Sequence, residues 1–258
     1  MKANYHTHTA RCLHAGGTEE DYILSALREG VDILGFSDHG PFEDTDYGYR
    51  MPFHELPEYI DTLNEMAKKY ENKIILRKGL EIEYLPKYLN YYEQLLTNLD
   101  YLLLGEHFYC SKDGSIHNIT KARTTEDYLE YANAIKEALS TGYFKVVAHP
   151  DLFTINETLI WDANCDRATD IILNAVLKTN TVLEYNANGL RRGIHSYPDG
   201  NRYQYPHNNF WLAAKASGIH AIVGSDCHNP KQVWDDVMKS AIENLKSLGI
   251  EPLEKLDL

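Results

Sequence analysis

Short apolar runs alternate along the chain with longer segments of helical periodicity. Seven runs are rich in β-branched and aromatic residues, which predicts strands. These runs are Ala3–His6, Val31–Phe36, Ile74–Ile82, Tyr101–Gly105, Val146–Ala148, Thr181–Tyr185 and Ile219–Gly224. The segments between and after them space their apolar residues three and four apart, as amphipathic helices do. We expect helices over Glu19–Glu29, Leu56–Tyr70, Tyr88–Asn98, Glu126–Thr141, Asp166–Lys178, Asn208–Ser217 and Val233–Leu248.

The order of these elements predicts the fold class. Strands that alternate with helices form a mostly parallel sheet, because each helix carries the chain back to the same edge. An open doubly wound sheet usually has a glycine-rich phosphate loop after its first strand, whereas here that strand leads into His6-Thr7-His8. We therefore predict an α/β fold, a distorted seven-stranded (β/α)7 barrel that is TIM-barrel-like. Its 258 residues suit a single domain spanning positions 1–258.

Composition narrows the classes of partner. The formal net charge is -13 and no basic run is present, so we expect no nucleic-acid partner. No stretch approaches the ~18 apolar residues of a membrane helix. The first residues show no apolar signal segment either, so we expect no membrane partner and a cytoplasmic location. The four cysteines, which lack the spacing of zinc or redox motifs, are expected to be free thiols: Cys12, Cys110, Cys165 and Cys227.

Histidines and carboxylates gather where the predicted strands end. A single histidine is more often structural than a metal ligand, but its position can change that expectation. The strand ends carry His6, His8, Asp38, His39, Glu81, His107, His149, Asp226 and His228. All strands of a parallel barrel end on one face, so these side chains should converge there. Imidazoles and carboxylates together suit Zn, Mn, Fe or Co ions, which predicts a metal centre.

These motifs resemble those of the polymerase and histidinol phosphatase (PHP) family along essentially the whole chain. The matching elements are His6-Thr7-His8, His14, Ser37-Asp38-His39, Glu81, His107, His149-Pro150 and Gly224-Ser225-Asp226-Cys227-His228. The resemblance implies a distorted seven-stranded barrel with three divalent transition-metal ions, of which Mn, Fe and Zn are the candidates. It implies one ion on His6, His8, Glu81 and Asp226, a second on Glu81, His107 and His149, and a third on His14, His39 and His228.

Within the family, the chain is most similar to the stand-alone histidinol-phosphate phosphatases, notably over the segment Leu183–Arg192. This similarity implies a small phosphorylated substrate, L-histidinol phosphate, which is hydrolysed in histidine biosynthesis. It implies that Arg191 or Arg192 binds the phosphate, since a guanidinium can hold phosphate through two hydrogen bonds. Asp226 would orient the hydroxide nucleophile that closely spaced metal ions make available near neutral pH.

Other side chains are candidates for the pocket. The long connection Gly193–Gly200 suggests a functional lid, and its His195 and Tyr197 could line the substrate pocket. Glu83 could bind the ammonium group of the substrate or lie at the surface. Asp38 is expected to orient a liganding imidazole.

Three alternatives remain open from the sequence. One is hydrolysis of another phosphoester by the same site, such as a nucleotide, a cyclic phosphate or a phosphoprotein. A DNA exonuclease is disfavoured by the net charge. A non-catalytic metal protein is disfavoured because structural zinc sites are usually closed and rich in thiolates. The sequence predicts no oligomeric state.

Overall fold

The computed structural model describes all 258 residues, and its centre is a sheet of seven parallel strands. In sheet order the strands are β1 (Ala3–Asn4), β2 (Ile33–Phe36), β3 (Ile75–Ile82), β4 (Tyr101–Leu104), β7 (Val146–Val147), β8 (Val182–Asn186) and β11 (Ala221–Gly224). A parallel bridge between Thr7 and Cys227 joins the two outer strands just beyond their ends. The predicted distorted seven-stranded barrel is therefore confirmed, with its least regular seam between β1 and β11.

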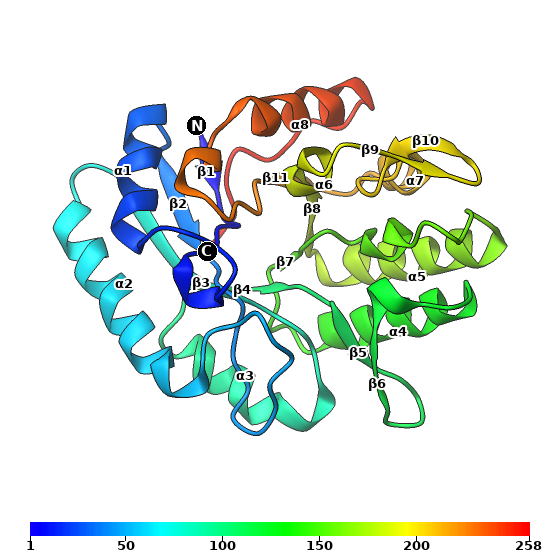
Figure 1. Cartoon of the computed structure of the whole chain (residues 1–258), viewed down its shortest axis with the longest axis horizontal. Helices are drawn as coiled ribbons and strands as arrows, with labels where there is room; N and C mark the ends of the chain where they lie inside the picture. The colour runs from blue at the N-terminus through cyan, green and yellow to red at the C-terminus, as the bar shows by residue number, and fades with distance from the viewer.

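The helices surround these strands (Figure 1). They are α1 (Glu19–Glu29), α2 (Leu56–Tyr70), α3 (Leu89–Leu96), α4 (Glu126–Ser140), α5 (Ala163–Thr179), α6 (Ala187–Arg191), α7 (Asn208–Ala216) and α8 (Asp236–Ser247). The first two match the predicted helices at both ends. Helix α5 begins earlier than predicted, because the Asp162 side chain accepts hydrogen bonds from the amides of Asn164 and Cys165 and caps the helix. None of the helices has the length and apolar character needed to cross a membrane.

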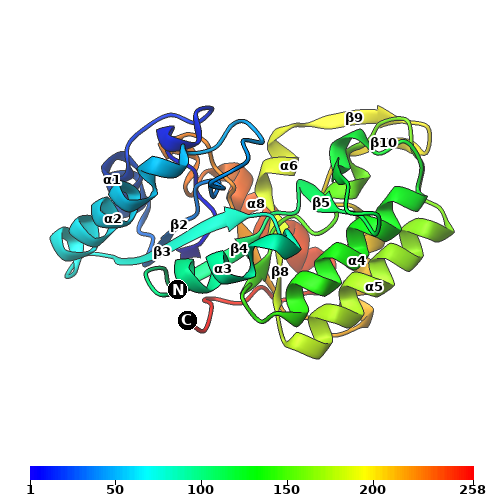
Figure 2. The ribbon, with the colours of Figure 1, turned by 90° about the horizontal axis from the view of Figure 1, so that it is seen from below.

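Three elements stand where the sequence predicted only loops. Two are short antiparallel hairpins, β5 (Phe108–Cys110) with β6 (Ile116–Asn118), and β9 (Ile194–Tyr197) with β10 (Gly200–Tyr203). The third is the short helix α6. In Figure 2, α6 and β9 lie on the side of the molecule opposite the two chain termini. These additional elements therefore lie at one end of the barrel and do not change its seven-stranded architecture.

The barrel interior is packed, so the site can lie only at an end. Alternate strand positions such as Ile33, Leu103 and Ile222 form a small buried cluster inside the barrel, and Leu256 from the C-terminal tail joins it. The amide of Leu256 donates to the Tyr5 hydroxyl at 3.1 Å, which holds the tail in place. The end of the barrel near the termini is thus plugged by apolar side chains, and the opposite end carries polar ones.

Candidate metal centre

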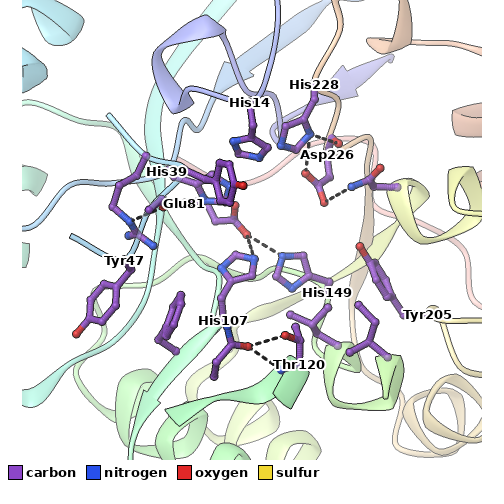
Figure 3. Close-up of a pocket in the computed structure, with 18 of the residues that line it drawn as sticks. His14, His39, Tyr47, Glu81, His107, Thr120, His149, Tyr205, Asp226 and His228 are labelled. Atoms are coloured by element: carbon purple, nitrogen blue, oxygen red, sulfur yellow. Dashed lines mark hydrogen bonds and ion pairs between the residues drawn. The ribbon is translucent and has the colours of Figure 1, made fainter. Parts of the chain in front are cut away.

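The structure brings all nine predicted metal ligands together at the end of the barrel where the strands finish. They are His6, His8, His14, His39, Glu81, His107, His149, Asp226 and His228. Seven of them line an open cavity of about 720 Å³. The other two, His6 and His8, lie beneath the cavity with no exposed surface. Figure 3 shows the arrangement, with His107 and His149 both directed at Glu81, and with His14 beside His228.

The deepest group combines two imidazoles with two carboxylates. The Nε2 atoms of His6 and His8 are only 3.0 Å apart, and each is 3.3 Å from Glu81 Oε2. Asp226 Oδ1 lies 3.6 Å from His6 Nε2 and 3.3 Å from His8 Nε2. The ligand atoms of His6, His8 and Glu81 therefore lie within 4.8 Å of one another, with Asp226 beside the two imidazoles. The family resemblance assigns these four residues to the first ion.

The hydrogen bonds around this group favour the binding of a metal cation. Glu184 Oε1 lies 2.8 Å from His6 Nδ1 and accepts its hydrogen, which leaves the Nε2 lone pair directed at the group. Glu81 Oε2 is buried and has no hydrogen-bond partner. A buried, unpartnered carboxylate oxygen facing two imidazole nitrogens is costly unless a positive charge lies between them. The donor set suits a divalent transition metal.

The second group is built on the other oxygen of Glu81. His149 Nε2 lies 2.7 Å from Glu81 Oε1, and His107 Nε2 lies 3.7 Å from the same atom. His39 Nδ1 lies 3.1 Å from the other oxygen, Oε2, and the ligand atoms of His39, Glu81 and His107 all lie within 4.8 Å of one another. Glu81 is therefore positioned to be shared by two ions. His39, which the sequence assigned to the third ion, lies between that group and the Glu81 carboxylate.

The third group lies nearest to solvent and contains His14 and His228, whose ring centroids are 4.5 Å apart. The Cys12 carbonyl oxygen is 2.8 Å from His14 Nδ1, and the Asp226 carbonyl oxygen is 3.2 Å from His228 Nδ1. Carbonyl acceptors on Nδ1 leave both Nε2 atoms free to bind a metal. The ligand atoms of Cys12, His14 and His228 all lie within 4.8 Å of one another.

Electrostatics give the cluster an affinity for positive charge. Burial disfavours the charged forms of Glu81 and Asp226, but the imidazoles, His6 foremost, hold the pKa of both carboxyls well below the ordinary range. Burial also opposes charge on His6, yet Glu184, Asp226 and Glu81 together raise its pKa to about 10. A site that binds a proton this tightly also attracts a metal cation, and the two compete.

Carboxylates behind the cluster orient its imidazoles. Besides His6, Glu184 binds the amide of His149 at 3.1 Å. Glu83 accepts two hydrogen bonds from the Arg50 guanidinium, at 2.9 and 3.1 Å, and its Oε1 lies 3.4 Å from His107 Nδ1. Glu83 is therefore neither at the surface nor available for the substrate's ammonium group. Its contacts show that it orients His107.

The backbone at two strand ends is strained. His149 has a φ of 30° and Asp226 a φ of 45°, in the left-handed region that non-glycine residues rarely adopt. Both residues belong to the ligand cluster. Glycines make room beside it, since a Cβ at Gly105 would overlap the Glu81 carboxylate and one at Gly224 would overlap the Glu184 carboxylate.

The PHP domain matches residues 4–188 of this chain. The chain belongs to the PHP domain family. The predicted ligands Asp226 and His228 of this PHP protein lie beyond the matched residues, but matches to individual relatives extend over them. The probable histidinol-phosphatase of Deinococcus radiodurans is 28% identical over 252 residues, which cover 95% of this chain and 92% of the relative. The histidinol-phosphatase of Bacillus subtilis is 26% identical over 262 residues, which cover 90% of this chain and 96% of the relative.

A solved structure shows the same fold as this PHP protein. It is the histidinol phosphate phosphatase of Lactococcus lactis, complexed with zinc, L-histidinol and phosphate. The TM-score is 0.74 at 18% identity, and the match covers 100% of this chain and 99% of that chain. The distorted barrel is thus shared over its full length.

The two candidate phosphate-binding arginines of this PHP protein have different surroundings. The Arg191 guanidinium donates to both carboxylate oxygens of Asp235, at 3.1 and 2.9 Å, and also to the carbonyl oxygens of Ser225 and Gln232. Both arginines line the cavity, but Arg192 lies over the Tyr205 ring and makes only a 3.5 Å hydrogen bond to Gln204. Of the two, Arg192 has donors to spare, whereas Arg191 is engaged in holding the end of β11.

Three other candidates lie elsewhere than the sequence suggested. His195 Nδ1 is 2.9 Å from Glu157, and the Tyr197 hydroxyl donates to the Ile155 carbonyl, so neither side chain lines the cavity. Asp38 accepts from the amide and hydroxyl of Thr9, not from an imidazole, and burial raises its pKa to about 7. Through these hydrogen bonds, Asp38 stabilises the loop that carries His8.

The sequence also missed residues that form the outer wall of the cavity. Phe108 and Asn118 come from the β5–β6 hairpin, and Thr120 and Lys121 follow it. Tyr47 stacks on Phe108 with ring centroids 4.7 Å apart, which extends this wall. In Figure 3, Tyr47 and Tyr205 stand on opposite sides of the pocket. The Asp113-Gly114 pair at the turn of the hairpin was the one signal that could have revealed it.

Proposed function

We propose that this protein is a trinuclear metal-dependent phosphomonoesterase that converts L-histidinol phosphate to L-histidinol and phosphate. The observation that carries the proposal is the convergence of seven imidazoles and two carboxylates on the floor of an open cavity that Arg192 also lines. The names of the two relatives and the ligands of the Lactococcus lactis structure support the choice of substrate. A cytoplasmic role in histidine biosynthesis, carried by one PHP domain over residues 1–258, belongs to the same proposal.

The ligand groups described above would hold the ions. Zn, Mn and Fe are the candidates, since each accepts imidazole and carboxylate ligands. When bound, three divalent ions would polarise the phosphate oxygens and make hydroxide available near neutral pH. Glu81 directs one oxygen to the first group and the other to the second, so it fixes the separation between them.

Asp226 is the residue placed to direct the nucleophile. Its Oδ1 faces His6 and His8, while its Oδ2 accepts hydrogen bonds of 3.2 Å from the side-chain amides of Asn186 and Asn188. The neighbouring imidazoles, His6 foremost, keep Asp226 ionised, and the two amides fix its plane. Oδ1 is then held where it can orient the attacking hydroxide.

In this proposal Arg192, rather than Arg191, binds the phosphate. Its side chain is exposed and lines the cavity, and its guanidinium lies 5.8 Å from the centre of the Tyr205 ring. A planar guanidinium can donate two parallel hydrogen bonds to phosphate oxygens, which positions the phosphorus and stabilises charge in the transition state. Phosphoryl transfer depends largely on such positioning and charge stabilisation.

Phosphate release from a panel of esters tests this function. The panel contains L-histidinol phosphate, nucleotides, sugar phosphates, a phosphotyrosine peptide and an aryl phosphate, each offered to metal-loaded protein. We expect selective turnover of L-histidinol phosphate that is abolished in Asp226→Ala and retained in Glu157→Gln, which alters a carboxylate outside the cluster. Turnover of another ester in its place would support the assignment as a metallophosphatase and contradict L-histidinol phosphate as its substrate. No turnover of any ester with three ions bound would contradict the enzyme assignment.

A further inference from the structure

We propose that the Cys12 sulfur is a thiolate ligand of the ion held by His14 and His228. The ligand atoms of these three residues lie within 4.8 Å of one another, a separation that a single ion can bridge. The inference rests on the proposed function only in requiring a metal ion at this third group. It adds a sulfur donor to a centre that otherwise offers nitrogen and oxygen.

The local fold presents the sulfur and the His14 ring to the same point. Cys12 ends a 3-10 helix (Ala10–Cys12) and has no exposed surface. Leu13 then adopts a φ of 65°, which turns the chain back so that the Cys12 carbonyl can accept from His14 Nδ1. This bond leaves His14 Nε2 free on the side of the third group. One short turn therefore supplies two potential ligands.

An independent observation comes from His8. His8 is fully buried, and its Nε2 faces His6, Glu81 and Asp226 in the first group. A neutral ring whose Nε2 binds a metal carries its proton on Nδ1, so Nδ1 is then a hydrogen-bond donor. In the structure His8 Nδ1 has no hydrogen-bond partner, and a buried donor without an acceptor is costly.

The Cys12 sulfur is the candidate acceptor for His8 Nδ1. The ligand atoms of His8, Cys12 and Asp38 lie within 4.8 Å of one another, but Asp38 already accepts from both the amide and the hydroxyl of Thr9. A thiol that donates its own hydrogen to the Thr9 carbonyl, 3.1 Å away, is a poor acceptor. A metal-bound thiolate has no hydrogen to donate, and its sulfur can accept from His8.

Ligation changes the chemistry of the third site. As the metal–sulfur bond forms, the thiol proton passes to solvent, because thiolate is the form that binds metals. One thiolate with two imidazoles favours zinc over manganese, which prefers oxygen donors. Of the four cysteines, only Cys12 belongs to any potential ligand group, so the other three provide internal controls.

Cobalt substitution tests the proposal, because a cobalt–thiolate bond absorbs in the near ultraviolet and cobalt bound only to nitrogen and oxygen does not. We would load the full-length protein with three equivalents of Co(II) and compare wild type with Cys12→Ser and Cys227→Ser. Cys227 is equally buried and adjoins His228, but it belongs to no ligand group. We expect the band in wild type and Cys227→Ser and its loss in Cys12→Ser. One ion should also leave Cys12→Ser at least tenfold more readily in a chelator competition.

A second measurement needs no variant. X-ray absorption at the zinc edge of wild-type protein should show a sulfur shell at ~2.3 Å, corresponding to one sulfur among three ions. Three bound ions with neither a sulfur shell nor a near-ultraviolet band would overturn the proposal. A band that survives in Cys12→Ser and disappears in Cys227→Ser would also overturn it. If L-histidinol phosphate is nevertheless hydrolysed, the proposed function stands without the thiolate, so the two failures are distinguishable.

Discussion

Glu184 Oε1 lies 2.8 Å from His6 Nδ1, and both side chains are at least 98% buried, since their exposed fractions are 2% and 0%. The second oxygen of Glu184 binds the amide of His149 and the side-chain amide of Asn186. One carboxylate therefore orients a proposed ligand of the first ion and the strand end that carries a proposed ligand of the second. A partner of this kind fixes the tautomer of the imidazole and raises its basicity.

We predict that Glu184→Gln weakens metal binding about 10- to 100-fold, as loss of such a partner does in other metal sites. The amide keeps the size of the side chain but not its charge. Metal content after dialysis and competition with a chelator would measure the effect. The matched control is Glu157→Gln, which alters an equally short carboxylate–imidazole pair, with His195, outside the cluster. Equal metal affinity in the two variants would contradict the role of Glu184.

Alanine substitutions of the two neighbouring arginines should have different effects, one on catalysis and the other on stability. Arg192→Ala should lower kcat/KM about 100-fold with little loss of stability, because it removes a charged contact to phosphate. Arg191→Ala should cost about 3 kcal/mol of folding free energy, because it leaves Asp235 and two carbonyl groups without their partner. Steady-state kinetics and thermal unfolding of both variants separate these effects. The opposite pattern would make Arg191 the phosphate contact.

The sequence could predict that the strand-end side chains converge, because this follows from topology, whereas His14 was assigned from the family resemblance alone. Parallel strands end on one face, so the polar residue after each strand must lie there, whatever its distance along the chain. The choice between Arg191 and Arg192 could not be predicted in this way. These residues end the short helix α6, where successive side chains point about 100° apart, and the sequence segment was expected to be a loop. Both side chains line the cavity, and only the hydrogen bonds of Arg191 to Ser225, Gln232 and Asp235 decide which guanidinium keeps free donors.

Glu184 was missed for a different reason. It lies inside β8, between Leu183 and Tyr185, whereas the predicted ligands lie where the strands end. A carboxylate in a buried strand is rarely tolerated without a partner, so its presence was itself a signal of the site. The β5–β6 hairpin was not predicted, because each of its strands has only three residues, too few for a periodic pattern to appear.

Acid should destabilise the protein through His207, outside the ligand cluster. Burial, reinforced by Arg202, lowers the pKa of His207 to about 4, and its neutral Nδ1 accepts from the Asn209 amide at the start of α7. The unfolded chain takes up this proton near pH 6.5, so stability is lost as the pH falls from 6.5 to 4, by up to about 3 kcal/mol.

His207→Asn should remove this part of the acid sensitivity, because asparagine caps a helix but does not titrate. Denaturant unfolding of chelator-treated wild type and variant between pH 7 and 4 would measure it, since titration of the other groups is common to both. The variant should gain stability relative to wild type as the pH falls. Two curves that stay parallel would show that His207 does not titrate in this range.

Gly105 is predicted to be essential for the shared carboxylate. A methyl group there would overlap Glu81, so Gly105→Ala should displace the residue on which two ligand groups depend. We expect loss of bound metal and a cost of roughly 1–3 kcal/mol from overpacking. Gly16→Ala, where a Cβ would meet no atom within 4 Å, is the matched control. Elemental analysis of both purified variants checks the prediction, and full metal content in Gly105→Ala would refute it.

The central claim is that hydrolysis of L-histidinol phosphate depends on a cluster of three ions. The most direct test is the rate of phosphate release from that ester as divalent zinc, manganese or iron is titrated into chelator-stripped protein. We predict a rate that is absent before addition and reaches a plateau near three ions per chain. Hydrolysis that is unaffected by stripping, or no hydrolysis after three ions have bound, would contradict the claim.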